Sequence, residues 1–169
     1  MKKIAFIGTH GTGKTTLAHE LVSDLKKQGL DADFLGEVAR SCPFPINEEA
    51  TKKSQFWIIL SQIIKEMENE DKTEVLICDR SVLDPYVYYV SKFGRVRAIE
   101  DLVKKHLSTY SMLIKVPIKP GLLREDKVRS TNPEFQNKID SLMNKLLKSM
   151  KINYYDYTNL ENIKKSIIK

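Results

Sequence analysis

The sequence has few cysteines and lacks a long apolar segment. Its two cysteines, Cys42 and Cys78, neither make up a disulfide framework nor have the spacing of a zinc site. The apolar run over residues 4–7 is far too short for a membrane span or for a signal-peptide core. Internal repeats and low-complexity segments are also lacking. We therefore expect a cytoplasmic protein with no membrane partner.

The composition is that of a globular protein with one domain. Of its 169 residues, 41% are hydrophobic and 30% are charged, a balance that supports one buried core. The net charge of +6 lies in residues 115–169, which hold 12 Lys and Arg against 6 Asp and Glu. In residues 1–114 the 16 basic and 16 acidic side chains cancel. This charge leaves open a nucleic-acid partner, although a solvated lysine-rich face fits it equally well. The sequence also leaves a homodimer open.

Apolar runs and helical periodicities alternate along the chain. Residues 2–7 form an apolar run closed by a glycine, and residues 14–28 follow with apolar positions at helical spacing. The same patterns predict strands at 33–36, 75–78, 112–116 and 151–155, and helices at 48–70 and 96–107 and from Pro85, Pro133 and about 159. Such alternation is typical of a parallel sheet covered on both faces. We predict an α/β fold, a three-layer α/β/α sandwich with a parallel five-stranded sheet, as a single domain over residues 1–169.

The segment between the first strand and the first helix carries the strongest motif. Residues 8–15, with the sequence GTHGTGKT, match the phosphate-binding pattern G-x-x-x-x-G-K-[ST]. Glycines permit a bend that turns backbone N–H groups inward, and the helix N-terminus behind the bend favours anions. We therefore expect a nucleoside triphosphate, ATP, to bind here. The residues expected to bind it are Gly8, Thr9, His10, Gly11, Thr12, Gly13, Lys14, Thr15 and Thr16.

The polar side chains of this motif suggest how the phosphates and a metal ion are held. Lys14 would reach the β- and γ-phosphates, and the Thr15 hydroxyl would bind Mg²⁺. Asp79 follows an apolar strand, where a carboxylate can orient Mg²⁺ beside the loop, so it is the second expected metal ligand. The side chains of His10 and Thr12 are interpreted as loop filler.

Two observations favour a kinase over other proteins with phosphate-binding loops. Asp79 is followed by Arg80 and not by a glutamate that would polarise water, which argues against a hydrolysing motor. Residues 137–140 have the sequence NKID, which resembles a guanine-binding tetrapeptide. Guanine recognition needs that tetrapeptide at a strand end, whereas Ile139 belongs to the apolar face of a predicted helix. We therefore interpret the tetrapeptide as helix surface.

Charged residues follow the second and third predicted strands, at strand ends that line one crevice in a parallel sheet. Glu37 would accept the proton of an attacking hydroxyl or hold that hydroxyl in place. The alternative is a cap or a surface ion pair with Arg40. Arg80 would clamp a phosphate or pair with a neighbouring carboxylate. With Asp84, these residues are expected to bind the acceptor. Glu37 and Arg80, together with Lys14, are the candidates for phosphoryl transfer.

A charged segment after the fourth predicted strand has the composition of a lid. Residues 123–129 have the sequence LREDKVR, within a lid-like segment at about 120–133. The guanidinium groups of Arg124 and Arg129 would neutralise charge as the γ-phosphate departs. A charged surface loop is the alternative interpretation.

Three pieces of the sequence resemble the P-loop nucleoside and nucleotide kinase superfamily. They are GTHGTGKTTLA at residues 8–18, EVAR at 37–40 and DRSVLDP at 79–85. The set is most similar to the nicotinamide riboside kinase-like branch, which is sometimes labelled as AAA-type ATPases. The DRS sequence is also similar to that of deoxynucleoside and thymidylate kinases.

The resemblance implies ATP-dependent phosphorylation of a nucleoside, a nucleotide or a related hydroxyl. It places Lys14, Thr15 and Asp79 on MgATP, Glu37 near the acceptor and Arg129 in the lid. Two other classes of function stay open. One is a kinase that acts on a hydroxyl or an end of DNA or RNA, and the other is a nucleotide-regulated ATPase or interaction module.

Overall fold

The structure is a computed structural model that describes residues 1–70, 72–119, 121, 132–157, 163–165 and 167. Its strands are β1 (Lys2–Ile7), β2 (Ala32–Leu35), β3 (Val75–Asp79), β4 (Met112–Lys115) and β5 (Tyr155–Asp156). Its α-helices are α1 (Lys14–Lys27), α2 (Lys52–Met67), α3 (Leu83–Phe93), α4 (Arg97–Leu107) and α5 (Pro133–Ser149). Short 3-10 helices span Val38–Ser41 and Asn47–Glu49.

The strands form one parallel sheet with β1 at its centre. The order is β2-β3-β1-β4-β5, and every neighbouring pair is parallel. Because the strands run in one direction, their carboxyl ends meet at one edge, where loops can bring distant residues together. The predicted parallel five-stranded sheet is confirmed.

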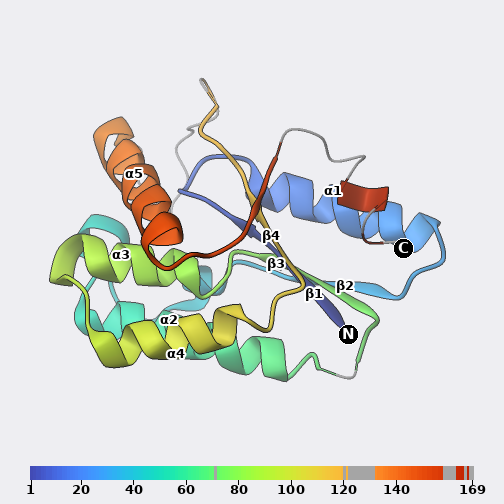
Figure 1. Cartoon of the computed structure of the whole chain (residues 1–169), viewed down its shortest axis with the longest axis horizontal. Helices are drawn as coiled ribbons and strands as arrows, with labels where there is room; N and C mark the ends of the chain where they lie inside the picture. Colours follow the sequence, from blue (N-terminus) through green and yellow to red (C-terminus); the bar gives the residue numbers. More distant parts are fainter. Residues whose placement is uncertain (71, 120, 122–131, 158–162, 166, 168–169) are drawn as a thin grey trace.

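Helices cover both faces of the sheet, as Figure 1 shows. On one face α1 packs against the sheet together with Ile163 and Ile167 from the C-terminal segment. On the other face α2, α3, α4 and α5 bury a second apolar cluster. The predicted three-layer sandwich is therefore confirmed. Within the described ranges, no helix has both the length and the apolar character needed to cross a membrane.

Local sequence signals explain where two of the helices begin. Thr51 and Ser54 form a capping box at the start of α2, in which each side chain accepts a hydrogen bond from the backbone N–H of the other. Asn132 caps α5 through its side chain, and Pro133 fills the first position of that helix, where its missing N–H costs nothing. Two prolines precede α2 in the chain, and its first residue is Lys52, four residues later than predicted.

The last strand differs most from its prediction. We predicted a strand over residues 151–155, whereas β5 spans Tyr155–Asp156. Lys151 adopts a φ of 54° and ends α5, because its N–H bonds to the carbonyl of Lys148 and that of Ile152 bonds to the carbonyl of Leu147. This hydrogen-bond pattern is a Schellman motif. The apolar Ile152 therefore packs beside the helix core and not in the sheet.

Candidate active site

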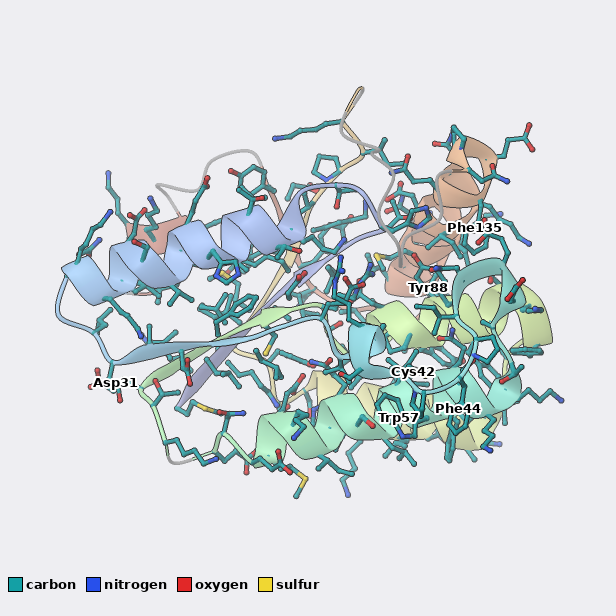
Figure 2. The ribbon with its side chains drawn as sticks, turned by 180° about the vertical axis from the view of Figure 1, so that it is seen from behind. Asp31, Cys42, Phe44, Trp57, Tyr88 and Phe135 are labelled. Carbon is teal, nitrogen blue, oxygen red and sulfur yellow. The ribbon has the colours of Figure 1, made fainter. Side chains whose placement is uncertain are left out.

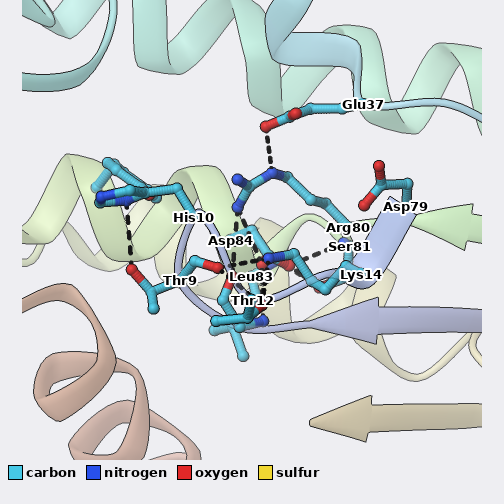
Figure 3. Close-up of polar contacts among 12 residues, drawn as sticks. Thr9, His10, Thr12, Lys14, Glu37, Asp79, Arg80, Ser81, Leu83 and Asp84 are labelled. Atoms are coloured by element: carbon cyan, nitrogen blue, oxygen red, sulfur yellow. Dashed lines mark hydrogen bonds and ion pairs between the residues drawn. The ribbon is translucent and has the colours of Figure 1, made fainter. Parts of the chain in front are cut away.

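The side chains predicted to act together meet at the carboxyl edge of the sheet. β1 and β3 lie side by side with Phe6 paired to Asp79, and β2 pairs with the other side of β3. The chain after β2 therefore brings Glu37 to the same edge. Figure 3 shows Glu37, Arg80 and Lys14 converging there.

The phosphate-binding loop needs glycine at three positions. Gly8, Gly11 and Gly13 have φ angles of 145°, 69° and 86°, which residues with a side chain rarely adopt. At Gly8 a Cβ atom would also lie 2.7 Å from the carbonyl oxygen of Val116. The Gly8 N–H donates to Oδ1 of Asp84 at 3.1 Å. This amide therefore anchors the base of the loop to the start of α3.

Lys14 is buried at the first position of α1. Its Nζ donates to the carbonyl oxygen of Thr9 at 2.5 Å and to the hydroxyl of Thr12 at 3.2 Å, so the interpretation of Thr12 as loop filler is wrong. Burial, followed by the nearby charge of Arg80, lowers the pKa of the Lys14 ammonium to about 7. Both hydrogen-bonded oxygens are uncharged, so an arriving phosphate would offer this ammonium a direct anionic partner.

Thr15 and Asp79 lie together as the motif predicts for a magnesium site. The Thr15 hydroxyl donates to Oδ2 of Asp79 at 2.6 Å. Oxygen ligands of this kind fit Mg²⁺. In proteins this ion usually keeps several water ligands and also coordinates substrate phosphates. The described residues contain no cluster of three or more His, Cys, Asp or Glu side chains that could hold a metal. A Mg²⁺ ion held by Thr15 and Asp79 would take its further ligands from waters and substrate phosphates.

Arg80 is buried in a backbone conformation that is rare for a residue with a side chain. Its φ is 94°, and such conformations cost about 1–3 kcal/mol each. Its Nε donates to Oε1 of Glu37 at 2.5 Å, and its Nη1 donates to the carbonyl oxygen of Gly8 at 3.3 Å. Burial opposes the charge of Arg80, but Glu37 and other nearby groups outweigh burial and raise its pKa above the usual value. Of the two alternatives for Arg80, the structure thus contains the carboxylate pair.

The Glu37 carboxylate is held by two arginines. Besides Arg80, Arg40 lies near it, with Nε 3.2 Å from Glu37 Oε2. The Arg40 side chain is 39% exposed, whereas those of Arg80 and Glu37 are 9% and 8% exposed. The ion pair between Glu37 and Arg40 is therefore present, and it adds to the buried contact with Arg80.

Asp84 connects the phosphate-binding loop to the turn after β3. Its side chain is fully buried, and Oδ2 accepts from the N–H and the hydroxyl of Ser81 at 2.9 Å and 3.1 Å. Burial raises the pKa of Asp84 above its usual value, although Arg80 opposes the shift. These contacts describe an internal support for Gly8 and Ser81, and the predicted contact of Asp84 with an acceptor stays a prediction.

Two cavities share Glu37 and Arg80 as a common wall. The first follows the loop and is lined by Gly11, Thr12, Gly13, Lys14, Thr15, Glu37, Asp79 and Arg80. The second has mainly apolar walls and is lined by His10, Glu37, Ala39, Ile46, Asn47, Gln55, Ile58, Arg80, Pro85 and Tyr88. A carboxylate and a guanidinium group thus line both a polar cavity along the loop and a mainly apolar cavity beside it.

The second cavity contains residues that the sequence did not single out. Gln55 is buried on α2 and lines this cavity. The buried face of α2 is largely polar, because Ser54, Gln55, Gln62 and Glu66 are buried there beside Ile58 and Ile59. Buried polar side chains need partners, but the apolar periodicity of this helix does not indicate which of its polar residues are buried.

His10 joins the loop to α3 and α5, so its interpretation as loop filler is wrong. Its ring is 1% exposed, and its Nδ1 lies 2.8 Å from the hydroxyl of Tyr88. The ring stacks on Phe135 with centroids 5.7 Å apart, and Gln136 donates to the His10 carbonyl at 2.7 Å. Figure 2 labels Tyr88 and Phe135, which meet between the two helices. These contacts join elements far apart in the sequence, which is why the motif alone did not indicate them.

A buried polar cluster lies behind the site around Glu66 of α2. The Glu66 carboxylate lies 2.7 Å from Lys3 Nζ and 2.7 Å from His106 Nε2. Gln62 donates to Glu66 at 2.8 Å and to the carbonyl oxygen of Arg80 at 3.3 Å. The backbone carbonyl of Arg80 is thereby held by Gln62, in addition to the guanidinium contacts of its side chain.

The remaining predicted residues fall in three groups. Thr16 is exposed on α1. Arg124 and Arg129, with most of the lid-like segment, lie outside the described residues. Residues 137–140 lie within α5 with Ile139 fully buried, so this tetrapeptide is not at a strand end.

Comparisons with known proteins agree with this architecture. A family model described as an AAA domain matches residues 3–162. The structure of deoxyadenosine kinase from M. mycoides with bound dATP has a TM-score of 0.68 at 16% identity, and the match covers 100% of both chains. A second structure of that enzyme, with the products dCMP and a flexible dCDP, has a TM-score of 0.64 at 15% identity and covers 98% of this chain and 96% of that chain. No curated protein matches the sequence. The likeness to these structures shows the P-loop nucleoside kinase-like fold.

Proposed function

This chain belongs to the AAA domain family, and we propose that it is an ATP- and Mg²⁺-dependent phosphotransferase. Its acceptor is a hydroxyl or phosphate of a nucleoside, a nucleotide or a related small molecule. The observation that carries the proposal is the shared wall of Glu37 and Arg80 between the loop-lined cavity and the mainly apolar cavity. A donor phosphate on one side of that wall and an acceptor on the other would meet beside a carboxylate.

In the proposed reaction the acceptor oxygen attacks the γ-phosphorus while the bond from that phosphorus to the β–γ bridging oxygen breaks, and ADP leaves. Glu37 accepts the proton that the acceptor hydroxyl loses. Lys14 and Arg80 offset the negative charge that develops on the transferred group. When bound beside Thr15 and Asp79, Mg²⁺ would neutralise the phosphate oxygens.

The second cavity supports a small acceptor that contains an apolar ring. Ala39, Ile46, Ile58 and Pro85 supply apolar walls, and the Gln55 side chain supplies both a donor and an acceptor group. A nucleobase has this combination of flat apolar faces and polar edges. The bound dATP, dCMP and dCDP in the similar structures are consistent with such a ligand.

A substitution of Glu37 tests the proposal most directly. Glu37→Gln should lower acceptor-dependent ADP release by about 10²- to 10⁴-fold, the usual contribution of a positioned general base, while calorimetry still detects MgATP binding. Lys14→Ala should lose MgATP binding itself. Asp101→Asn, a matched change at a carboxylate whose side chain is 65% exposed, should behave as the wild type. The proposal fails if no nucleoside or nucleoside monophosphate stimulates ADP release from protein that binds MgATP.

A substitution in the second cavity tests the acceptor class. Gln55→Leu keeps the size of the side chain but removes its hydrogen-bonding groups, so a bound base would leave polar atoms unpaired at a cost of about 1–3 kcal/mol. We expect the acceptor KM to rise by about 10- to 100-fold with the KM for ATP unchanged. Equal changes in both constants would contradict the assignment of this cavity to the acceptor.

The other two classes of function have separate tests. A nucleic-acid acceptor requires binding that weakens steeply as salt rises, because neutralised phosphates release counterions. An interaction module requires ligand-dependent partner binding that survives Glu37→Gln.

A further inference from the structure

The outer side of α5 carries a row of positive charges. Figure 1 shows this helix at the margin of the molecule. Its apolar residues face the core, and its other side is exposed. The exposed residues of segment 137–153 are Asn137, Lys138, Ser141, Asn144, Lys145, Lys148, Ser149, Lys151 and Asn153. They include four lysines and no acidic residue, and we call this surface the lysine face.

The lysines of this face differ from many other surface lysines of the chain. Lys27, Lys65 and Lys104 each pair with a carboxylate on the same helix or just beyond its end. Among the described residues, no ion pair involves a lysine of the lysine face. Asp140 lies beside the face in sequence, but Lys115 already binds its carboxylate at 3.0 Å. A bound polyanion would therefore neutralise charges that the described part of the protein leaves unneutralised.

Helix stability accounts for only part of this row. A cation in the last turn of a helix interacts favourably with the helix dipole, and Lys148 lies there. Lys138 and Lys145 come before that turn. Lys145 and Lys148 are three residues apart and therefore neighbours on the helix surface, where like charges repel. The row thus costs the helix some stability, which a bound polyanion would restore.

A hollow at the end of the lysine face can receive a flat ring. Its volume is about 430 Å³, and it is lined by Asn144, Leu147, Lys148, Lys151, Ile152, Asn153 and Tyr154. Leu147 and Ile152 supply apolar contacts, and the asparagine side chains supply hydrogen-bond donors and acceptors. Tyr154 is 38% exposed, so its ring is accessible for stacking. An unpaired nucleobase has the flat faces and polar edges that match this lining.

One class of partner combines phosphates for the lysines with a base for the hollow. From the lysine face and the hollow we infer that the outer side of α5 binds single-stranded nucleic acid. A single strand offers a row of phosphates together with unpaired bases that can stack on aromatic rings. Lys138 and Lys148 are about 15 Å apart along the helix, a length that about four phosphates span at about 3.4 Å each.

Other anionic partners fit this surface less well. A helix that lies on a membrane buries an apolar face in the lipid, whereas Ile139, Met143 and Leu146 of α5 are already buried in the core. A run of acidic side chains would pair with the lysines but would leave the hollow unfilled.

Fluorescence anisotropy with a labelled oligothymidylate of about 12 nucleotides tests the inference. We expect the logarithm of the affinity to fall linearly with the logarithm of salt concentration, with a slope of about −3 for four phosphate contacts. Lys145→Gln should make the slope shallower by about 0.7 and lower the affinity about fivefold at about 0.1 M salt. Lys105→Gln, a matched change at an exposed lysine of α4, should behave as the wild type. Absence of binding at about 50 mM salt would overturn the inference.

A substitution in the hollow separates stacking from charge. Tyr154→Ala should lower the affinity by about 5- to 150-fold, the usual contribution of a stacked base, and should leave the salt slope unchanged because no charge is lost. Tyr154→Phe keeps the ring and should behave as the wild type. An unchanged affinity in Tyr154→Ala would refute the base contact, and equal competition by a duplex of the same length would refute the single-stranded partner.

Competition and vesicle binding identify the partner. Equal competition by polyglutamate would assign the face to acidic proteins. Binding to phosphatidylcholine–phosphatidylglycerol vesicles without binding of the oligonucleotide would assign it to a membrane. Either outcome would overturn the inference, and so would equal competition by thymidine monophosphate, which has no row of phosphates. Lys145 is not among the residues assigned to the proposed reaction, so Lys145→Gln should keep MgATP binding and acceptor-dependent ADP release. A failure of this inference is thereby distinguished from a failure of the proposed function.

Discussion

At the scale of single residues, the buried ammonium of Lys14 determines how the loop should respond to pH. Its pKa of about 7 in the free protein reflects burial first and Arg80 second. A bound triphosphate places negative charge against the ammonium and raises that pKa. The complex therefore holds a proton that the free site lacks above neutral pH.

The affinity for MgATP should consequently fall as pH rises above about 7, by up to about tenfold per unit. Calorimetry at pH 8 in buffers with different ionisation enthalpies should detect the uptake of close to one proton on binding. Lys14→Arg is the control, because a guanidinium stays charged throughout this range and should show no such uptake. A wild-type affinity that is constant from pH 7 to pH 9 would contradict the lowered pKa.

Single residues also show what the sequence can and cannot indicate. The contact between Thr15 and Asp79 could be predicted from two short motifs. One motif places Thr15 at the start of the first helix, and the other places Asp79 at the end of an apolar strand. Glu37 contacts both Arg40 and Arg80. The sequence could not predict these contacts, because an arginine near a carboxylate can equally form an ion pair with it or bind a phosphate. Gln55 was missed because no local pattern says which polar residue of a helix faces a cavity.

At the scale of elements, α2 connects the site to a buried charge cluster. Burial opposes the ionisation of Glu66, but His106, Lys3 and Tyr110 outweigh burial and lower its pKa below the usual value. The carboxylate is therefore ionised in the folded protein and balances the charge of the buried Lys3. The cluster also contacts the carbonyl of Arg80 through Gln62, so it supports both folding and the site.

Glu66→Gln should destabilise the protein by about 3–5 kcal/mol, because it leaves the Lys3 charge buried without a counter-charge. The lowered pKa means that Glu66 stabilises the fold above the unfolded-state pKa of about 4.3 and that this contribution is lost as pH falls through the folded-state pKa. The difference between variant and wild type should therefore narrow below about pH 4. Urea unfolding of both proteins at several pH values measures this difference in the free energy of unfolding. Glu68→Gln, which removes an exposed ion pair with Lys65, is the control and should change little.

A cap at the start of the same helix offers a test on stability alone. Thr51→Ala removes the side-chain oxygen that accepts from the Ser54 N–H, a change that costs about 0.5–2 kcal/mol. Because the hydrogen bonds of this cap join Thr51 and Ser54 to each other, ATP affinity should stay unchanged in a binding assay. Weaker ATP binding would show that the start of α2 is coupled to the loop.

The elements were more predictable than the contacts between them. Each strand up to β4 was placed to within one residue, because apolar runs bounded by glycine or charge are clear signals. β5 was misplaced because the left-handed Lys151 and the helix-ending bonds of Ile152 occupy residues that looked like a strand.

At the scale of the whole molecule, the chain should unfold as one unit. The described helices and strands pack on a single sheet, and the prediction of one domain over residues 1–169 has this behaviour as its test. Calorimetry should record one cooperative transition. Two separable transitions would contradict the single domain.

MgATP should raise the temperature of that transition. At a nucleotide concentration of about 100 times Kd, binding adds about 2.7 kcal/mol to stability, or a rise of about 5–11 °C for a chain of this size. A thermal-shift assay should show this rise for the wild type and for Glu37→Gln, but not for Lys14→Ala. If MgATP also raised the transition temperature of Lys14→Ala, the nucleotide would bind outside the phosphate-binding loop.

The position of β2 in the sheet has a consequence for how such a protein changes over time. β1 and β3, which carry the loop and Asp79, each have neighbours on both sides, whereas β2 lies at the border of the sheet with β3 as its neighbour. Glu37 and the chain that forms much of the second cavity follow this border strand. Insertions and substitutions in the segment after β2 should perturb the core less than changes near β1 or β3. The acceptor specificity can therefore change while the residues that bind the phosphates stay the same. Laboratory selection for altered acceptor choice should therefore accumulate changes first in residues 38–50, while Glu37 is retained.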